Sequence, residues 1–224
     1  MATIRGTESS DRLIGTNADD LIEALGDRDT LDGGGGRDTL KGADGGDWLT
    51  DTLTEKSLAL GSQVYGEGGA DSLRFQSPLT EVTLDGGDDA DSFQLQGYFR
   101  SSTLVGGGGS DTIRFESSIS NIYLVADSGA DLITAQGSVV RASVLAGSDN
   151  DTILLGDVVT DTSIAGGVGE DCLRFDGALI RSCVWGGDYD AALNGGSSDG
   201  ADTFQLQSIS SSRILANSGR DLIE

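Results

Sequence analysis

The sequence predicts an all-β fold, a parallel β-solenoid in which short repeats stack as successive coils. Three observations predict it. An Asp-x-apolar unit recurs at regular spacing along the 224 residues, apolar and polar residues alternate after each Asp, and Gly-rich segments precede many of the units. One repeat cannot bury its apolar face alone. Stacked copies can, because each coil pairs with the next at a strand spacing of ~4.8 Å.

Residues 1–50 form the first predicted region, a β-roll with a nine-residue repeat. The unit recurs without a miss at Asp11, Asp20, Asp29, Asp38 and Asp47. Two units, eighteen residues, should make one coil. Asp11, Asp29 and Asp47 are then expected on one edge of the solenoid, and Asp20 and Asp38 on the other. Residues 51–70 carry a change of period, so we expect a distorted transition coil there.

Residues 71–224 form the second predicted region, a β-helix with a twenty-residue coil. The unit recurs at Asp71, Asp91, Asp111, Asp131, Asp151 and Asp171, and then at Asp202 and Asp221 after an insertion near 188–199. Apolar residues fall two, four, eight and thirteen places after the Asp, as in Phe93, Leu95, Phe99 and Leu104. This spacing predicts strand, bend, strand and turn, with all these aspartates stacked on a single edge.

Composition restricts the partners of the chain. There are 14 Lys and Arg residues against 37 Asp and Glu residues, a formal net charge of −23 at pH 7. Such a chain repels nucleic acids and acidic membranes and attracts cations. Histidine is absent, and Cys172 and Cys183, which we expect as free thiols, are too few for a disulfide framework. No apolar stretch reaches the length of a membrane span, and the N-terminus lacks the apolar segment of a secretory signal peptide. We therefore expect no nucleic-acid partner and no membrane span.

The Gly-Asp turns predict metal sites. Glycine permits positive φ, which lets backbone carbonyls point into a turn, and Ca²⁺ prefers six to eight carbonyl and carboxylate oxygens. Carboxylates stacked ~5 Å apart repel one another by about 3 kcal/mol per pair at an effective dielectric of about 20. A divalent ion between two carboxylates replaces this repulsion with attraction, so folding should be coupled to metal binding. The alternative is that Asp and Gly simply favour tight turns, and it is strongest before Asp11, Asp131 and Asp221, where the glycines are partly replaced.

The turns resemble the nonapeptide of RTX proteins, Gly-Gly-x-Gly-x-Asp followed by x-apolar-x. The best matches are residues 33–40, 106–113 and 166–173. The resemblance implies several Ca²⁺ ions wedged between successive coils. The ligand residues that it implies are Asp11, Asp20, Asp29, Asp38, Asp47, Asp71, Asp91, Asp111, Asp131, Asp151, Asp171, Asp202 and Asp221, with turn residues Gly33, Gly34, Gly36, Gly86, Gly87, Gly106, Gly107, Gly109, Gly166, Gly167 and Gly169.

The same resemblance implies an extracellular or cell-surface bacterial protein, commonly exported by type I secretion and folding when it meets calcium outside the cell. We expect a calcium-binding structural module. It should not be an enzyme, because no cluster of acid, base and nucleophile interrupts the repeat. The alternative is a calcium-dependent accessory domain of a secreted polysaccharide-acting or hydrolytic enzyme. Because the chain stops inside a repeat strand at 221–224, we expect it to be part of a longer protein.

Two features outside the turns bear on further partners. Outward residues three and five places after the Asp, such as Arg74, Gln94 and Gln96, form a polar ladder that either meets an extracellular polysaccharide or is a solvated face with side-chain pairing along it. The insertion at 188–199 either carries recognition or is a tolerated surface loop. A flat Thr-x-Thr array would suggest ice binding. Ser or Thr fills many sites one place after the Asp, but Arg and Gln occupy the neighbouring ladder.

Overall fold

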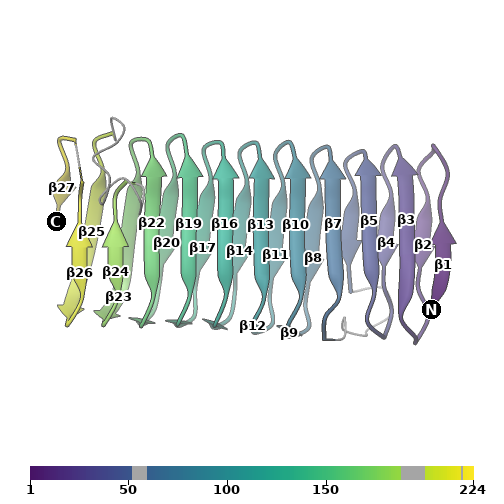
Figure 1. Cartoon of the computed structure of the whole chain (residues 1–224), viewed down its shortest axis with the longest axis horizontal. Coiled ribbons are helices and arrows are strands. Elements are labelled where there is room, and N and C mark those ends of the chain that lie inside the picture. Colours follow the sequence, from purple (N-terminus) through teal and green to yellow (C-terminus); the bar gives the residue numbers. More distant parts are fainter. Residues whose placement is uncertain (52–59, 188–199, 218) are drawn as a thin grey trace.

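The computed structural model describes residues 1–51, 60–187, 200–217 and 219–224, and these residues form a parallel β-solenoid (Figure 1). They contain strands and turns but no helix, so no helix in this part of the chain could cross a membrane. The predicted all-β, parallel solenoid is confirmed. Every strand pairs in parallel with its equivalent in the next coil, and the coils follow one another in chain order from β1 to β27.

Two sheets form the opposite walls of the solenoid. The front wall in Figure 1, sheet A, consists of β1 (Ala2–Arg5), β3 (Asp20–Gly26), β5 (Thr39–Asp44), β7 (Gln63–Gly68), β10 (Thr83–Asp88), β13 (Thr103–Gly108), β16 (Tyr123–Ser128), β19 (Ser143–Ser148), β22 (Ser163–Val168), β24 (Cys183–Trp185) and β26 (Arg213–Leu215).

The rear wall, sheet B, has one long strand per coil and, in the later coils, a second short one. The long strands are β2 (Arg12–Ile14), β4 (Thr30–Asp32), β6 (Trp48–Thr50), β8 (Ser72–Phe75), β11 (Ser92–Leu95), β14 (Thr112–Phe115), β17 (Leu132–Ala135), β20 (Thr152–Leu155), β23 (Cys172–Ile180), β25 (Thr203–Ser210) and β27 (Leu222–Ile223). The short strands are β9 (Leu79–Thr80), β12 (Phe99–Arg100), β15 (Ile119–Ser120), β18 (Val139–Val140) and β21 (Val159–Thr160).

The registers show how the two periods join. In the first coils the partners lie eighteen residues apart, as in Leu13↔Leu31, and from β7 to β24 they lie twenty apart, as in Leu84↔Leu104. They lie 30 or 31 residues apart across the insertion and 19 apart between β25 and β27. Across the expected transition the spacing is 24 residues, from Leu40 to Val64. Both sheets continue without a break through this longer coil. Residues 52–59 of the transition and the insertion 188–199 lie outside the described residues.

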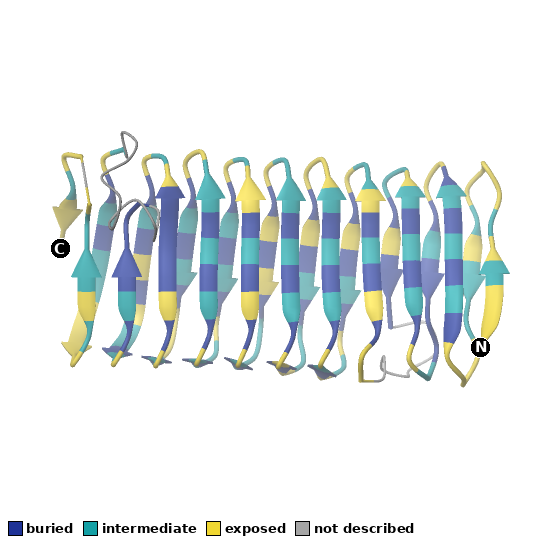
Figure 2. Cartoon of the chain, viewed as in Figure 1, coloured by how far each residue is buried: buried dark blue, intermediate teal, exposed yellow. Residues whose placement is uncertain are grey.

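The core is a set of apolar columns that run along the solenoid axis. The residues two, four, eight and thirteen places after Asp91, which are Phe93, Leu95, Phe99 and Leu104, are each no more than 2% exposed. Buried and outward residues alternate along the strands, which produces the dark bands of Figure 2. Because the inward positions of adjacent coils are in register, each apolar side chain stacks on its equivalent and the core is continuous.

Candidate metal centre

The repeat aspartates of the first edge, at the top in Figure 1, form one column from Asp11 to Asp221. At each step the backbone N–H of one Asp donates to Oδ1 of the Asp in the next coil. For example, the N···O distance is 2.7 Å from Asp71 to Asp91 and 2.7 Å from Asp91 to Asp111. The column runs through Asp11, Asp29, Asp47, Asp71, Asp91, Asp111, Asp131, Asp151, Asp171, Asp202 and Asp221. One oxygen of each carboxylate after Asp11 is therefore committed to the backbone ladder.

The second oxygen of most of these carboxylates is buried and lacks a hydrogen-bond donor. On the first edge this holds for Oδ2 of Asp29, Asp47, Asp71, Asp91, Asp111, Asp131 and Asp151, and on the second edge it holds for Oδ2 of Asp38. Buried polar atoms are nearly always paired, so a row of unpaired carboxylate oxygens calls for a missing partner. A cation is the partner that would satisfy a row of negative oxygens.

Backbone carbonyls lie beside these oxygens in the turns. A Cβ added to Gly86 would collide with Oδ2 of Asp91 and lie 2.6 Å from the carbonyl oxygen of Gly106 in the next coil. A Cβ added to Gly106 would collide with Oδ2 of Asp111 and lie 2.7 Å from the carbonyl oxygen of Ala126. A carboxylate oxygen and a carbonyl oxygen thus lie close to each of these glycines, and both are oxygen ligands of the kind that calcium prefers.

Burial makes the negative charge of the column costly. Burial first, and neighbouring carboxylates second, raise the pKa of Asp91 and of Asp151 to about 8, although a backbone hydrogen bond partly offsets the shift. In the same way the pKa of Asp71 and of Asp111 is raised to about 7. The pKa of Asp131 is raised to about 6. Without a cation, these carboxyl groups favour the protonated form in the folded chain.

The first two turns differ from the others because a threonine takes the place of the second glycine. Oδ2 of Asp11 accepts hydrogen bonds from the backbone N–H of Thr7 at 2.6 Å and from its hydroxyl at 2.8 Å. Oδ2 of Asp20 accepts the same pair from Thr16, at 2.6 and 2.8 Å. Burial tends to raise the pKa of Asp20, but these bonds and a bond from the N–H of Ala2 outweigh it and lower the pKa. Of the predicted ligands, Asp11 and Asp20 therefore have donors to Oδ2 that aspartates such as Asp71 and Asp91 lack.

The second edge, at the bottom in Figure 1, changes its chemistry along the solenoid. It begins with Asp20 and Asp38, as the sequence predicts, and the backbone N–H of Asp20 donates to Oδ1 of Asp38 at 2.9 Å. The N–H of Asp38 then donates to the hydroxyl of Ser62 at 3.0 Å. Gly33, Gly34 and Gly36 belong to this edge, in the turn before Asp38, where Gly34 packs against the first-coil carbonyl of Thr16.

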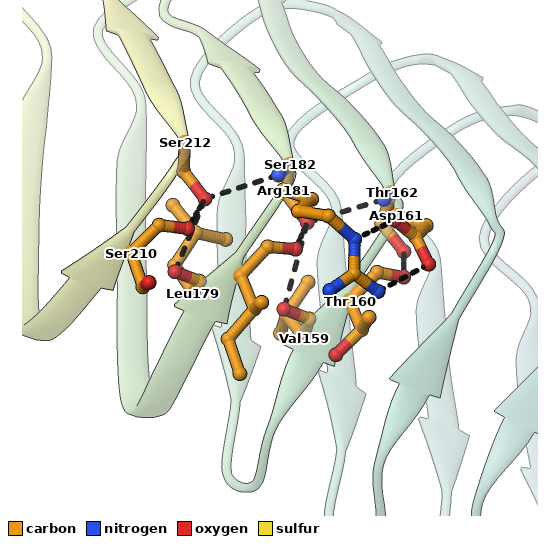
Figure 3. A network of polar contacts seen from close by, with 10 residues as sticks. Val159, Thr160, Asp161, Thr162, Leu179, Arg181, Ser182, Ser210 and Ser212 are labelled. Carbon is orange, nitrogen blue, oxygen red and sulfur yellow. Dashed lines mark hydrogen bonds and ion pairs between the residues drawn. The ribbon is translucent and has the colours of Figure 1, made fainter.

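From Ser62 onward, hydroxyl groups and alkyl side chains such as Val82 and Ala142 take the place of carboxylates on the second edge. Thr162 N–H donates to the hydroxyl of Ser182 at 3.1 Å, and Ser182 N–H donates to that of Ser212 at 3.0 Å (Figure 3). The Ser182 hydroxyl itself donates to the carbonyl of Ile180 at 2.9 Å. This uncharged ladder was missed in the sequence, although Ser or Thr eleven places after Asp91, Asp151 and Asp171 is a visible signal.

The donor set of the first edge fits calcium. It consists only of oxygens, from carboxylates and from the carbonyls of Gly-rich turns, and calcium prefers such hard ligands in flexible geometry. No group of three or more Asp, Glu, Cys or His side chains gathers at one point in the described part of the chain. Backbone carbonyls would therefore supply most of the ligands to any single ion. A bound calcium would neutralise the unpaired carboxylate oxygens that face each other across successive coils.

The predicted turn glycines accompany this column. Gly86, Gly106 and Gly166 each approach the carboxylate of their own turn too closely for any side chain. Gly87, Gly107 and Gly167 lie one residue further along, each with positive φ and each against a backbone carbonyl of the previous coil. Gly109 and Gly169 also have positive φ and pack against the turns of Asp89 and Asp149.

Part of the polar ladder of sheet B is paired within itself, whereas the buried Nε atom of Arg74 has no hydrogen-bond partner. The side-chain amide of Gln94 donates to Glu116 at 2.9 Å, and Nε of Arg114 lies 3.4 Å from the same carboxylate. Arg174 pairs with Asp176 at 2.7 Å. These contacts match the alternative of a solvated face with side-chain pairing. Cys172 and Cys183 are both free and half-buried.

Comparisons with known proteins agree with this geometry. The family model of the RTX calcium-binding nonapeptide repeat (4 copies) matches residues 5–40, 14–49 and 96–114. A solved structure described as a hyperactive, Ca²⁺-dependent, β-helical antifreeze protein from an Antarctic bacterium superposes with a TM-score of 0.65. The two chains are 18% identical, and the match covers 99% of this chain and 75% of the other, which establishes a shared fold. No curated protein sequence matches the chain at a significant level. Residues 5–49 and 96–114 therefore match RTX calcium-binding nonapeptide repeats, and they are built into a parallel β-solenoid.

Proposed function

We propose that this chain is a calcium-binding structural module of a secreted or cell-surface bacterial protein, and that it folds when it meets calcium. The observation that carries the proposal is the row of buried, donor-less Oδ2 atoms on the first edge. A net charge of −23 adds to the need for cations. RTX repeats are typical of secreted bacterial proteins, and type I secretion is the export route that they suggest.

A structural role as a scaffold fits this chain better than an enzymatic role. Many polar side chains of the described coils form periodic hydrogen bonds with the backbone or pairs such as Arg181–Asp161, at 2.7 Å. Regular coils of this kind supply a stiff rod with a repeating surface. We propose that such a rod displays or spaces other parts of a surface protein, with an extracellular polysaccharide as its partner.

The antifreeze activity of the structural neighbour is not proposed for this chain. The outward column that begins sheet B in each coil reads Ser72, Ser92, Thr112, Leu132, Thr152 and Cys172. The column beside it contains Arg74, Gln94 and Arg114. Long charged side chains interrupt any flat hydroxyl array, which is what an ice surface would need.

Calcium titration followed by circular dichroism tests the proposal. The metal-free chain should have little β signal near neutral pH, gain it cooperatively as calcium is added, and lose it again on addition of chelator. Magnesium is the matched control, because its smaller, octahedral site fits a turn of carbonyls poorly. A chain equally folded in chelator and in calcium would contradict the proposal.

A further inference from the structure

The turns that precede the repeat aspartates fall into two backbone classes. In most turns the second and fourth residues both have positive φ, as Gly107 at 110° and Gly109 at 111° do before Asp111. These positive-φ turns include residues 24–29, 33–38, 42–47, 66–71, 86–91, 106–111, 126–131 and 146–151. The threonine turns are residues 6–11 and 15–20. In them the corresponding residues all lack a positive φ, and these are Thr7, Ser9, Thr16 and Ala18.

The two classes also differ at the carboxylate that ends the turn. Oδ2 of the final Asp is buried and lacks a donor in each of those positive-φ turns, for example at Asp38 and Asp91. In both threonine turns Oδ2 of the final Asp accepts two hydrogen bonds, from the backbone N–H and the hydroxyl of Thr7 or of Thr16. The backbone class and the pairing of the carboxylate therefore change together.

The absence of glycine does not by itself produce a threonine turn. Leu25 and Ala43 stand at the second place of their turns with φ of 98° and 71°, and Asp127 does so with φ of 81°. A positive φ is unfavourable for such residues, so the positive-φ geometry persists in spite of the side chain. Both threonine turns have a β-branched side chain with a hydroxyl at this place, and the positive-φ turns have neither feature there.

The threonine hydroxyl closes the turn from within. In turn 15–20, Oγ1 of Thr16 accepts the backbone N–H of Ala18 at 3.2 Å and donates to Oδ2 of Asp20 at 2.8 Å. The backbone N–H of Thr16 donates to the same oxygen at 2.6 Å. Turn 6–11 repeats all three contacts around its own threonine. Local bonds of this kind between a threonine and nearby backbone groups stabilise turns, so each threonine turn is held by its own polar groups.

Both oxygens of the Asp20 carboxylate already have donors. Oδ1 accepts the backbone N–H of Ala2 at 2.9 Å, and Oδ2 accepts the two bonds from Thr16, although Asp20 is only 1% exposed. The donor hydrogens carry partial positive charge, so they would repel a cation at that place. Asp38, the next aspartate of the second edge, accepts the N–H of Asp20 on Oδ1 but has an unpaired Oδ2. A cation would satisfy Asp38, whereas Asp20 is satisfied without one.

We infer that threonine caps hold Asp11 and Asp20 in place of calcium, and that the metal sites begin at Asp29 on the first edge and at Asp38 on the second. The RTX family model matches both threonine turns, within residues 5–40, so the repeat pattern alone does not assign an ion to each turn. The turns of the first coil then need no metal, and they offer the second coil an edge with which to pair. The inference rests on the proposed function, because it divides the repeats into those that bind calcium and those that do not.

The number of calcium ions bound to the full chain, measured by equilibrium dialysis and elemental analysis, tests the inference. Asp11→Asn and Asp20→Asn should leave this number unchanged. Asp29→Asn and Asp38→Asn are the matched controls, because they lie one coil further along the same two edges. Each control should lower the number by about one, because an amide nitrogen replaces a ligand oxygen. Circular dichroism in calcium shows whether each variant is folded.

The double substitution Thr16→Gly and Ala18→Gly tests the threonine cap by a gain of binding. It gives turn 15–20 the Gly-Gly-x-Gly-x-Asp pattern, so the chain should bind about one more ion, and it decides the question if Asp20→Asn does not fold. Loss of an ion from Asp11→Asn or Asp20→Asn, as large as from the controls, would overturn the inference. An unchanged number of ions in the double variant would overturn it as well. A chain that binds no calcium at all would instead contradict the proposed function.

Discussion

The metal-free protein should become more stable as the pH falls, because its buried aspartates bind protons more tightly in the folded chain. The pKa of Asp71 and of Asp111 is raised to about 7, and that of Asp91 and of Asp151 to about 8. In an unfolded chain an aspartate has a pKa of about 3.9. The stabilisation by these groups is therefore fully present below about pH 4 and is lost as the pH rises through 7 and 8.

The size of this effect is comparable with the whole stability of a domain. One pKa unit corresponds to 1.36 kcal/mol, so a carboxyl shifted from about 4 to about 7 costs roughly 4 kcal/mol when it is ionised in the folded chain. Four such groups cost roughly 16 kcal/mol together, and even one third of that, about 5 kcal/mol, equals the lower end of typical domain stabilities. Calcium between the carboxylates removes this cost. The metal-free chain should thus be largely unfolded at about pH 8 and regain structure at about pH 5.

The assay is circular dichroism on the calcium-free chain across this pH range, repeated with calcium. Asp91→Asn should flatten the pH dependence, because the amide resembles the protonated acid, and should also reduce the stabilisation by calcium. Glu170→Gln is the matched control, since Glu170 is an exposed residue beside the column whose loss should change neither. A calcium-free chain that is more folded at about pH 8 than at about pH 5 would refute the reasoning.

Three further substitutions separate the other stabilising contributions. Thr16→Ala removes the hydroxyl donor of the Asp20 carboxylate and keeps the backbone N–H of residue 16, so it should lower the melting temperature in chelator by the equivalent of about 1–3 kcal/mol; equal stability in chelator would contradict this role. Ser182→Ala leaves the buried N–H of Thr162 without its acceptor, and urea unfolding should show a loss of about 1–3 kcal/mol that is independent of calcium. Phe115→Ala opens a cavity in the core and should cost about 3–5 kcal/mol of unfolding free energy in calcium, whereas a cost below about 1 kcal/mol would mean that the core column collapses to fill it.

The overall fold and the first-edge column could be predicted because the repeat period alone determines them. Once Asp71 and Asp91 are twenty residues apart in identical coils, their stacking follows, and so does the burial of Phe93 and Leu95 on the inward face. The chemistry of individual turns does not follow from the period. In the sequence, Asp20 looks equivalent to every other repeat aspartate, whereas the structure shows that Thr16 donates two hydrogen bonds to its carboxylate.

The second edge shows the same limit of prediction from the sequence. A hydroxyl ladder is visible in the sequence only once the coil geometry places Ser62, Thr162 and Ser182 on one line, inward at the corner. Residues such as Val82 and Ala142 interrupt this column, so it lacks the strict recurrence that identifies the aspartates. The aspartate column could be predicted because its residue type recurs in every coil. The hydroxyl column could not, because only some coils place Ser or Thr at that position.

The change of repeat length follows from the charge that each coil must carry. An eighteen-residue coil places an aspartate on both edges, as Asp20 and Asp29 do, whereas a twenty-residue coil places one on the first edge and a hydroxyl or alkyl group on the second. The longer coil therefore halves the number of stacked carboxylates per turn of the solenoid, and with it the repulsion that cations must compensate. In the longer coils, calcium would be needed to hold only one edge, while neutral hydrogen bonds contribute to the other. Among the described residues, Oδ2 accordingly remains without a donor along the first edge, and on the second edge at Asp38, which lies in the eighteen-residue coils.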